Sequence, residues 1–292
     1  MIAKQKEILE TNRLFHNQIA HRHDKVNSYI SKNNCKKFYE NLFLRIIGKS
    51  NMELKKANVL ELGCGTGNFL GFLLTQNIDS YMGIDISEKM VDRAREKSLK
   101  PNSSSARISF YAKSAEDFIE EMQMKNKKFD VIFSFSFLHH LFDPKIFLHG
   151  LENILSPGGV YIALHEPNIS ARNEPDFSKY IDARAAYLFG YDTTDISVLL
   201  RIKKITSSFF RMLSRRMITS FNEENKAKVF DYVDYQLNFI NFNTSKIIED
   251  IASQNVRTYT ESYNYFVFDF LKKICKPSNN YFYLVVKNKG NS

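Results

Sequence analysis

The sequence lacks the features that mark membrane-spanning and secreted proteins. No apolar run approaches the roughly 18 residues that a membrane-spanning helix needs. The N-terminal residues, Met1-Ile2-Ala3-Lys4-Gln5-Lys6-Glu7, are polar and lack the apolar stretch of a signal peptide. Both absences predict a cytoplasmic protein.

Cysteine is scarce, and its placement argues against two kinds of site. Cys35, Cys64 and Cys275 are odd in number and lack the spacing of a metal centre or a disulfide framework. We therefore expect no metal site and a reducing compartment. Cys64 lies within a glycine turn, where we interpret it as a small tolerated residue rather than a catalytic thiol.

Acidic residues are outnumbered by basic ones. The 41 lysines and arginines against 32 acidic residues give a formal net charge of +9 at pH 7. Such a surplus of positive charge can favour binding to nucleic acid, to an anionic membrane surface or to an acidic substrate. It can equally reflect the lysine usage of an AT-rich genome, because asparagine, isoleucine, phenylalanine and tyrosine are abundant too. Composition leaves these alternatives open, and 292 residues suit one or two soluble domains.

Residues 59–70 predict a buried strand, a glycine turn and the start of a helix. Gly63, Gly65 and Gly67 lack a Cβ, so the backbone can turn sharply and approach a ligand closely. The next strand, over residues 81–87, carries Asp85 about 20 residues past the turn. A doubly wound fold places there the acid that binds a ribose hydroxyl. This combination predicts a nucleoside-containing cofactor.

The spacing of the turn indicates which cofactor. Glu61-Leu62-Gly63-Cys64-Gly65-Thr66-Gly67 resembles the E/D-x-G-x-G-x-G motif of class I S-adenosylmethionine-dependent methyltransferases, not the G-x-G-x-x-G of nicotinamide and flavin sites. Four more segments resemble that family in its own order: Gly83-Ile84-Asp85-Ile86-Ser87-Glu88-Lys89-Met90, Ser114-Ala115-Glu116-Asp117, Phe129-Asp130-Val131-Ile132 with Leu138-His139-His140-Leu141, and Leu155-Ser156-Pro157-Gly158-Gly159.

The resemblance implies an α/β fold: a Rossmann-like seven-stranded sheet, mostly parallel with an antiparallel last strand. A helical cap at the N-terminus and a helical lid insertion complete it. We predict one methyltransferase domain, made of the cap (1–50), the cofactor-binding core (51–168), the lid (169–242) and the last helix and strands (243–292).

Local patterns predict the individual elements. Expected strands cover 57–62, 81–87, 108–112, 131–135, 160–164, 256–268 and 281–287. Expected helices cover 67–76, 88–97, 115–124, 144–155 and 244–254. Ser87 suits the N-cap of the helix that follows it, and Pro144 suits the first position of another.

The resemblance also implies the contacts of S-adenosylmethionine. The glycine turn would meet its methionine moiety, Asp85 both ribose hydroxyls, and Ile86 and Met90 its adenine. The implied cofactor-binding set is Glu61, Gly63, Gly65, Thr66, Gly67, Asp85, Ile86, Met90, Ser114, Ala115, Glu116, Ser134 and Phe135.

This chain departs from the family at two of its motif positions. The family has aspartate where Ser114 stands, so Glu116 or a backbone carbonyl would hold the adenine amine. Within residues 15–24, a segment that resembles the family's cofactor-covering segment, His23 stands in place of tyrosine.

Methyl transfer is an in-line displacement that depends on alignment, and an acidic acceptor can also need a base. His139, His140 and His165 follow the ends of the fourth and fifth strands, where ligands bind in this architecture. We predict His139 and His165 as the catalytic candidates. The alternative is that one of the adjacent pair packs against, or caps, the next helix.

The predicted function is methyl transfer to a small-molecule or lipid-like acceptor, because Leu138-His139-His140 and the long stretch after the fifth strand resemble the small-molecule branch. An RNA or protein acceptor is the alternative. No N/D/S-P-P-Y/F element follows the fourth strand, no cysteine lies near the fourth or fifth strand, and no RNA-binding module is recognisable, so nucleic acid is not expected. A non-catalytic module is a third hypothesis, against which the intact glycines and Asp85 argue.

Residues 198–218 predict a basic amphipathic helix at about 3.6 residues per turn. Its basic stripe is Arg201, Lys204, Ser208, Arg211 and Arg215. One interpretation is a lid helix with its charges in water. The other is a stripe that recruits an anionic or lipid-linked acceptor, or that makes a peripheral contact with an acidic membrane.

Overall fold

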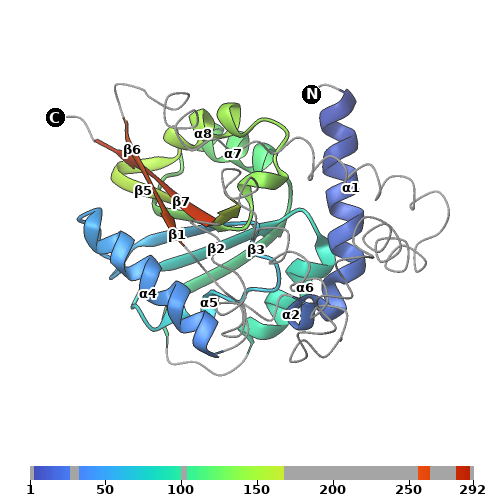
Figure 1. Cartoon of the computed structure of the whole chain (residues 1–292), viewed down its shortest axis with the longest axis horizontal. Helices are drawn as coiled ribbons and strands as arrows, with labels where there is room; N and C mark the ends of the chain where they lie inside the picture. The colour runs from blue at the N-terminus through green and yellow to red at the C-terminus, as the bar shows by residue number, and fades with distance from the viewer. Residues whose placement is uncertain (1–2, 27–32, 100–103, 168–255, 264–280, 290–292) are drawn as a thin grey trace, which may run out of the picture. The chain divides into compact units, whose positions relative to one another are not determined.

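The computed structural model describes residues 3–26, 33–99, 104–167, 256–263 and 281–289 (Figure 1). The predicted lid, the helix expected over 244–254 and the basic helix of residues 198–218 lie outside this part of the chain. The division into cap, core and lid therefore stays a prediction. No helix in the described part is long and apolar enough to cross a membrane.

A seven-stranded sheet in the order β3-β2-β1-β4-β5-β7-β6 forms the centre of the described structure (Figure 1). β1 to β5 pair in parallel, and the last strand, β7, is antiparallel, which confirms the predicted fold class. The strands are β1 Asn58–Leu62, β2 Ser80–Asp85, β3 Arg107–Ala112, β4 Phe129–Phe135, β5 Leu155–Pro167, β6 Val256–Tyr263 and β7 Tyr281–Asn288.

The order of the strands predicts where a ligand would bind. From β1 the chain proceeds to β2 on one side, whereas β4 lies on the other side of β1. In open parallel sheets ligands bind outside the carboxyl ends of the strands at such a point of reversal. The ends of β1, β2 and β4 therefore meet there: the glycine turn follows β1, Asp85 is the last residue of β2, and His139 lies in the turn after β4.

The central strands are buried because their apolar residues form nearly continuous runs. Residues 59–62 of β1 and 131–135 of β4 are all buried, as a parallel strand covered on both faces requires. β3, at the edge of the sheet, is largely exposed.

Four helices follow strands of the parallel half: α5 Leu70–Leu74, α6 Glu88–Ser98, α7 Ala115–Met124 and α8 Pro144–Glu152. Three of them begin at a side chain that accepts backbone N–H bonds: Ser87 for α6, Ser114 for α7 and Asp143 for α8. The predicted cap at Ser87 and the predicted position of Pro144 are thus confirmed.

The structure corrects two predicted helix boundaries. The helix expected over 67–76 spans only Leu70–Leu74, because Gly67 takes a left-handed φ of 74° that continues the turn. The helix expected to reach Leu155 ends at Glu152, because Leu155 already pairs with Phe129 of β4.

The N-terminal cap is helical, as predicted. It consists of α1 Ala3–Ile19, the short 3-10 turn η1 Ala20–Arg22, α2 His23–Val26 and α4 Asn33–Lys49. On α4, Tyr39, Phe43 and Ile46 are fully buried or nearly so, and the Phe43 ring packs edge-on against Phe133 of β4.

Candidate functional site

The glycine turn after β1 has the backbone that only glycine adopts at low cost. Gly63, Gly65 and Gly67 have φ values of 68°, 50° and 74°. A Cβ at Gly63 would lie 2.6 Å from the Phe137 ring, and one at Gly67 would lie 3.2 Å from the Cβ of Ala94. The φ values therefore disfavour larger residues at all three glycines, and lack of space also does so at Gly63 and Gly67.

The Asp85 carboxylate joins the glycine turn to the loop after β2. Its Oδ2 accepts the Gly65 N–H at 2.9 Å, and its Oδ1 accepts the Ser87 N–H at 2.9 Å. Burial raises the pKa of this carboxyl above its ordinary value, while the two backbone bonds oppose that shift. Asp85 is therefore held in place at the mouth of the crevice, and further hydrogen-bond donors would stabilise its charge.

Glu61, predicted as part of the glycine motif, is buried beneath the turn. Its carboxyl accepts a hydrogen bond from the Tyr81 hydroxyl of β2. Burial raises the pKa of Glu61 to about 8. This side chain is thus bonded within the sheet.

The residues predicted around adenine lie at the starts of α6 and α7, in or next to the loops after β2 and β3. Ile86 is half-buried, and Met90 is buried in a cluster with Ile19 and Ala20 of the cap. Ser114 caps α7: its hydroxyl accepts the Asp117 N–H and donates to the Asp117 carboxylate at 2.7 Å.

Ala115 and Glu116 are the first two residues of α7, directly after its N-cap Ser114. Ala115 is buried, and burial raises the pKa of Glu116 above its ordinary value. Because the Ser114 hydroxyl bonds Asp117, Glu116 and the backbone are the groups left for an adenine amine at this loop.

Ser134 and Phe135 close β4. Ser134 is fully buried, and its hydroxyl shares a 2.8 Å hydrogen bond with the hydroxyl of Tyr161. The Phe135 ring stacks on the His165 imidazole, with centroids 4.9 Å apart and planes 7° apart. The polar group of Ser134 is therefore engaged inside the sheet, whereas Phe135 packs against a candidate catalytic residue.

His139 forms a pair with a buried carboxylate. Its Nδ1 lies 2.8 Å from Oε2 of Glu166, a fully buried residue at the end of β5. Glu166 also accepts the backbone N–H groups of Phe137, Leu138 and His139. One carboxylate thus fixes both the loop and the imidazole ring, which remains partly exposed.

His165 is placed differently. It is buried, adopts a left-handed φ of 59°, and its Nδ1 lies 2.5 Å from the Ser136 hydroxyl. Phe135 stacks on its ring and Tyr39 meets that ring edge-on. Its contacts are those of a packed ring in the core.

The region that carries this geometry matches a known family. Residues 53–193 match a family model described as a methyltransferase domain. The core belongs to the class I S-adenosylmethionine-dependent methyltransferases.

Individual relatives cover parts of the chain. The 27-O-demethylrifamycin SV methyltransferase of Amycolatopsis mediterranei is 31% identical over 101 residues, 35% of each protein. The tRNA U34 carboxymethyltransferase of Idiomarina loihiensis is 33% identical over 108 residues, 37% of this chain and 32% of that protein. The matches span less than half the length of these curated relatives.

One solved structure resembles nearly the whole chain. The plantazolicin methyltransferase BamL, in complex with a triazolic desmethylPZN analog and SAH, aligns with 97% of this chain and 98% of its own at a TM-score of 0.53. The sequences are 15% identical, so this likeness concerns the fold.

The N-terminal cap is bonded to the glycine turn. The Asp24 carboxylate accepts hydrogen bonds from Thr66 at 2.6 Å and Asn68 at 3.2 Å, and pairs with Lys97 of α6 at 2.7 Å. The preceding residue, His23, holds its ring 3.6 Å from where a Cβ of Gly65 would lie. The hydroxyl of Thr66, a predicted cofactor contact, is therefore used to anchor the cap.

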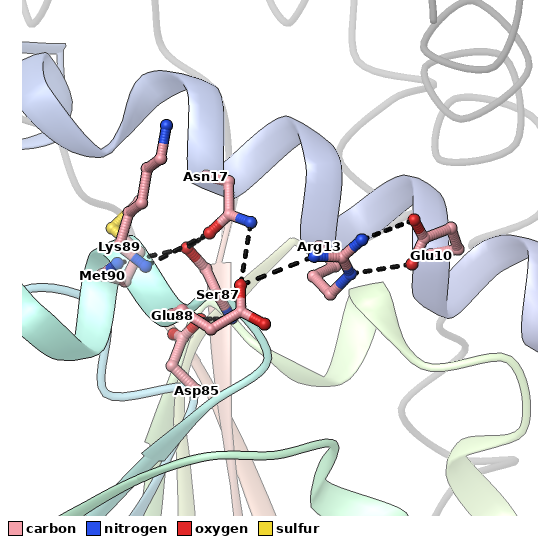
Figure 2. A network of polar contacts seen from close by, with 8 residues as sticks. All are labelled: Glu10, Arg13, Asn17, Asp85, Ser87, Glu88, Lys89 and Met90. Atoms are coloured by element: carbon pink, nitrogen blue, oxygen red, sulfur yellow. Dashed lines mark hydrogen bonds and ion pairs between the residues drawn. The ribbon is translucent and has the colours of Figure 1, made fainter.

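A second attachment joins α1 to the start of α6 (Figure 2). Asn17 Oδ1 accepts the Ser87 hydroxyl at 2.6 Å and the Lys89 N–H at 3.2 Å. Its Nδ2 donates to the Glu88 carboxylate, which also pairs with Arg13 at 3.5 Å. The cap is thus tied to the loop that follows Asp85.

Sequence reasoning missed four residues that organise the site: Asn17, Asp24, Lys97 and Glu166. Two of them carried a usable signal: Asp24 ends the segment of residues 15–24 that resembles the family's cofactor-covering segment, and Glu166 is an acid just after a predicted strand, at the ligand-binding edge. Among the described residues no group of three or more histidines, cysteines or acids could hold a metal ion.

Proposed function

We propose that the chain transfers a methyl group from S-adenosylmethionine to a small-molecule acceptor. The observation that carries the proposal is the Asp85 carboxylate, fixed between the glycine turn and the loop after β2. The 27-O-demethylrifamycin relative supports a small-molecule acceptor by its name.

The residues present fit the cofactor. A half-buried carboxylate with a raised pKa gains most from donors such as the two ribose hydroxyls, and Asp85 would accept both. The Gly63–Gly67 turn would present backbone N–H groups to the methionine end. Ile86 and Met90 would pack on adenine, with Glu116 at its edge. When bound, S-adenosylmethionine supplies an electrophilic methyl group.

His139 is the residue that we propose as the base. When Nδ1–H donates to Glu166, the other ring nitrogen has a lone pair and can accept the proton of an acceptor hydroxyl or amine. The buried Glu166 carboxylate then stabilises the imidazolium that forms. We prefer His139 to His165 because its ring is partly exposed, whereas His165 is packed in the core.

The acceptor is proposed to be anionic or lipid-linked, and the location cytoplasmic. The positive net charge supports an anionic acceptor. Changing Arg201, Arg211 and Arg215 together to glutamate tests this: weaker association with anionic vesicles supports a lipid-linked acceptor. If vesicle association and acceptor affinity are both unchanged, the stripe is a solvent-facing surface.

An RNA acceptor is the second candidate, supported by the match to the tRNA U34 carboxymethyltransferase. A salt titration of binding to bulk tRNA separates the two. Phosphate contacts would give an affinity that falls steeply with salt. If tRNA is not bound at low salt, the RNA reading fails.

Calorimetry with S-adenosylmethionine tests the cofactor proposal. Affinity in the micromolar range, roughly −8 kcal/mol, is expected for the native chain. Asp85→Ala should weaken it at least about tenfold, because a charge-assisted contact to both hydroxyls is lost. Asp79→Ala removes an exposed acid just before β2 and serves as the control. Equal affinity of the native chain and Asp85→Ala would contradict the ribose contact.

A further inference from the structure

Three histidines from two distant segments form a row of rings. His139 and His140 belong to the 3-10 turn η2, Leu138–His140, after β4, and His16 lies near the end of α1. The His139 and His140 centroids are 4.3 Å apart. The His140 and His16 centroids are 5.4 Å apart, in an edge-on arrangement. We call His16, His140 and His139 the imidazole row.

The two rings behind His139 are held without charge. Burial lowers the pKa of His16 to about 3 and that of His140 well below its ordinary value. Neighbouring imidazoles lower both pKa values further. Asn12 of α1 donates to the carbonyl oxygen of His140 at 3.3 Å, so the same helix also holds the backbone of η2.

The charged and titratable groups around the row come from four elements. The His139 ring has Glu166 of β5 on one side and His140 of η2 on the other. His16 of α1 faces His140, and His23 at the start of α2 faces His16.

We propose that His16 is a positioning residue for His139: acting through the His140 ring, it holds the His139 imidazole against Glu166. The proposal rests on the role of His139 proposed above. Under this proposal α1 influences the base His139, although α1 itself need not touch the reacting atoms.

The physical reason is that the His16 ring covers one side of the half-buried His140 ring. With His16 docked, the His140 ring stays neutral. Without the His16 ring, more of the half-buried His140 imidazole would meet water, so the burial that lowers its pKa would weaken and the ring would take up a proton more readily. A positive charge about 4 Å from His139 opposes a second charge there and lowers its affinity for protons.

Titration of the histidine ring protons by NMR tests this in the full chain without any acceptor. Spectra would be followed from about pH 5 to about pH 8, with each histidine assigned by its own substitution to glutamine. The variants are His16→Ala, which removes the ring, and His16→Phe, which keeps an aromatic edge. His21→Ala removes an exposed histidine of the same cap and is the matched control.

The proposal expects His140 to titrate within this range only in His16→Ala. It also expects the midpoint of His139 to fall there by about one pH unit, a tenfold loss of proton affinity. His16→Phe and His21→Ala should keep the native midpoints. If His16→Ala does not fold, His16→Gln, which also lacks a ring, takes its place with the same expected shift.

An unchanged His139 midpoint in the ringless variant would overturn the proposal, as would an equal shift in His16→Phe. A native chain that failed to bind S-adenosylmethionine would contradict the proposed function without altering these midpoints. The two failures are therefore distinguishable.

Discussion

Glu61 shows at the scale of one residue how burial changes a carboxyl group. Its neighbours on β1 are apolar, and the Tyr81 hydroxyl is its hydrogen-bond donor. With a pKa of about 8, raised by burial, Glu61 is largely protonated at pH 7 in the folded chain, whereas it is ionised in the unfolded chain. Folding therefore takes up a proton at this residue.

This uptake gives a pH dependence of stability with a definite sign. Because the folded pKa is raised, the contribution of Glu61 is fully present below its unfolded value of 4.5 and is lost as pH rises to about 8. The free energy of unfolding of the native chain, relative to Glu61→Gln, should fall by up to about 1.4 kcal/mol per pH unit across that window. Urea unfolding at several pH values measures it. A difference that stays constant with pH would mean that Glu61 is ionised in the folded state.

At the scale of elements, the start of α6 depends on its N-cap residue Ser87, which is also hydrogen-bonded to α1. Ser87 Oγ accepts the Met90 N–H at 3.1 Å and donates to Asn17 of α1 at 2.6 Å (Figure 2). The sequence reveals the first bond, because serine before a helical run is a favoured N-cap. The second bond needs α1 to lie across the start of α6.

Ser87→Ala should therefore lower the free energy of unfolding by more than the loss of an ordinary N-cap residue does. A lost N-cap costs about 1 kcal/mol, and leaving the Asn17 carbonyl oxygen with one donor fewer adds to it. We expect urea unfolding to show a loss of about 1–2 kcal/mol. Ser98→Ala removes a hydroxyl at the other end of α6 and should have little effect. Equal losses of unfolding free energy in Ser87→Ala and Ser98→Ala would contradict this double role of Ser87.

At the scale of the whole molecule, Asp24 is the main anchor of the cap. Burial alone would raise the pKa of this carboxyl, but His23, Lys97 and Thr66 together lower it below its ordinary value. A lowered pKa means that the contribution of Asp24 is present above its unfolded value of 3.8 and is lost only in strong acid. The cap should thus stay anchored at neutral pH.

Asp24→Asn should loosen the cap without unfolding the sheet. Hydrogen exchange read by mass spectrometry should rise at least about tenfold over residues 12–24, because a charge-assisted bond is lost, while β1 and β4 keep their protection. Asp92→Ala breaks an exposed ion pair on the same α6 and is the control. If exchange in the cap does not change, Asp24 is not its anchor.

The sequence by itself determined the sheet, the glycine turn after β1 and the place of Asp85 at the end of β2. Apolar runs, alternate glycines, an acid after the second strand and a serine before α6 act over a few residues, so each is visible in the printed chain. The predicted antiparallel last strand is also confirmed. Helix ends were less well predicted, because the turn at Gly67 and the pairing of Leu155 end or shorten a helix that propensity would continue.

Only the tertiary structure decided which side chains meet. The sequence predicts Ser114 and Ser134 as cofactor contacts, and only the structure reveals that their hydroxyls bond Asp117 and Tyr161. The contacts of His139 with Glu166, of His16 with His140 and of Asp24 with Lys97 join residues far apart in the chain. No local pattern encodes such pairs, because they depend on where folded loops come to lie and on which polar groups burial leaves in need of a partner.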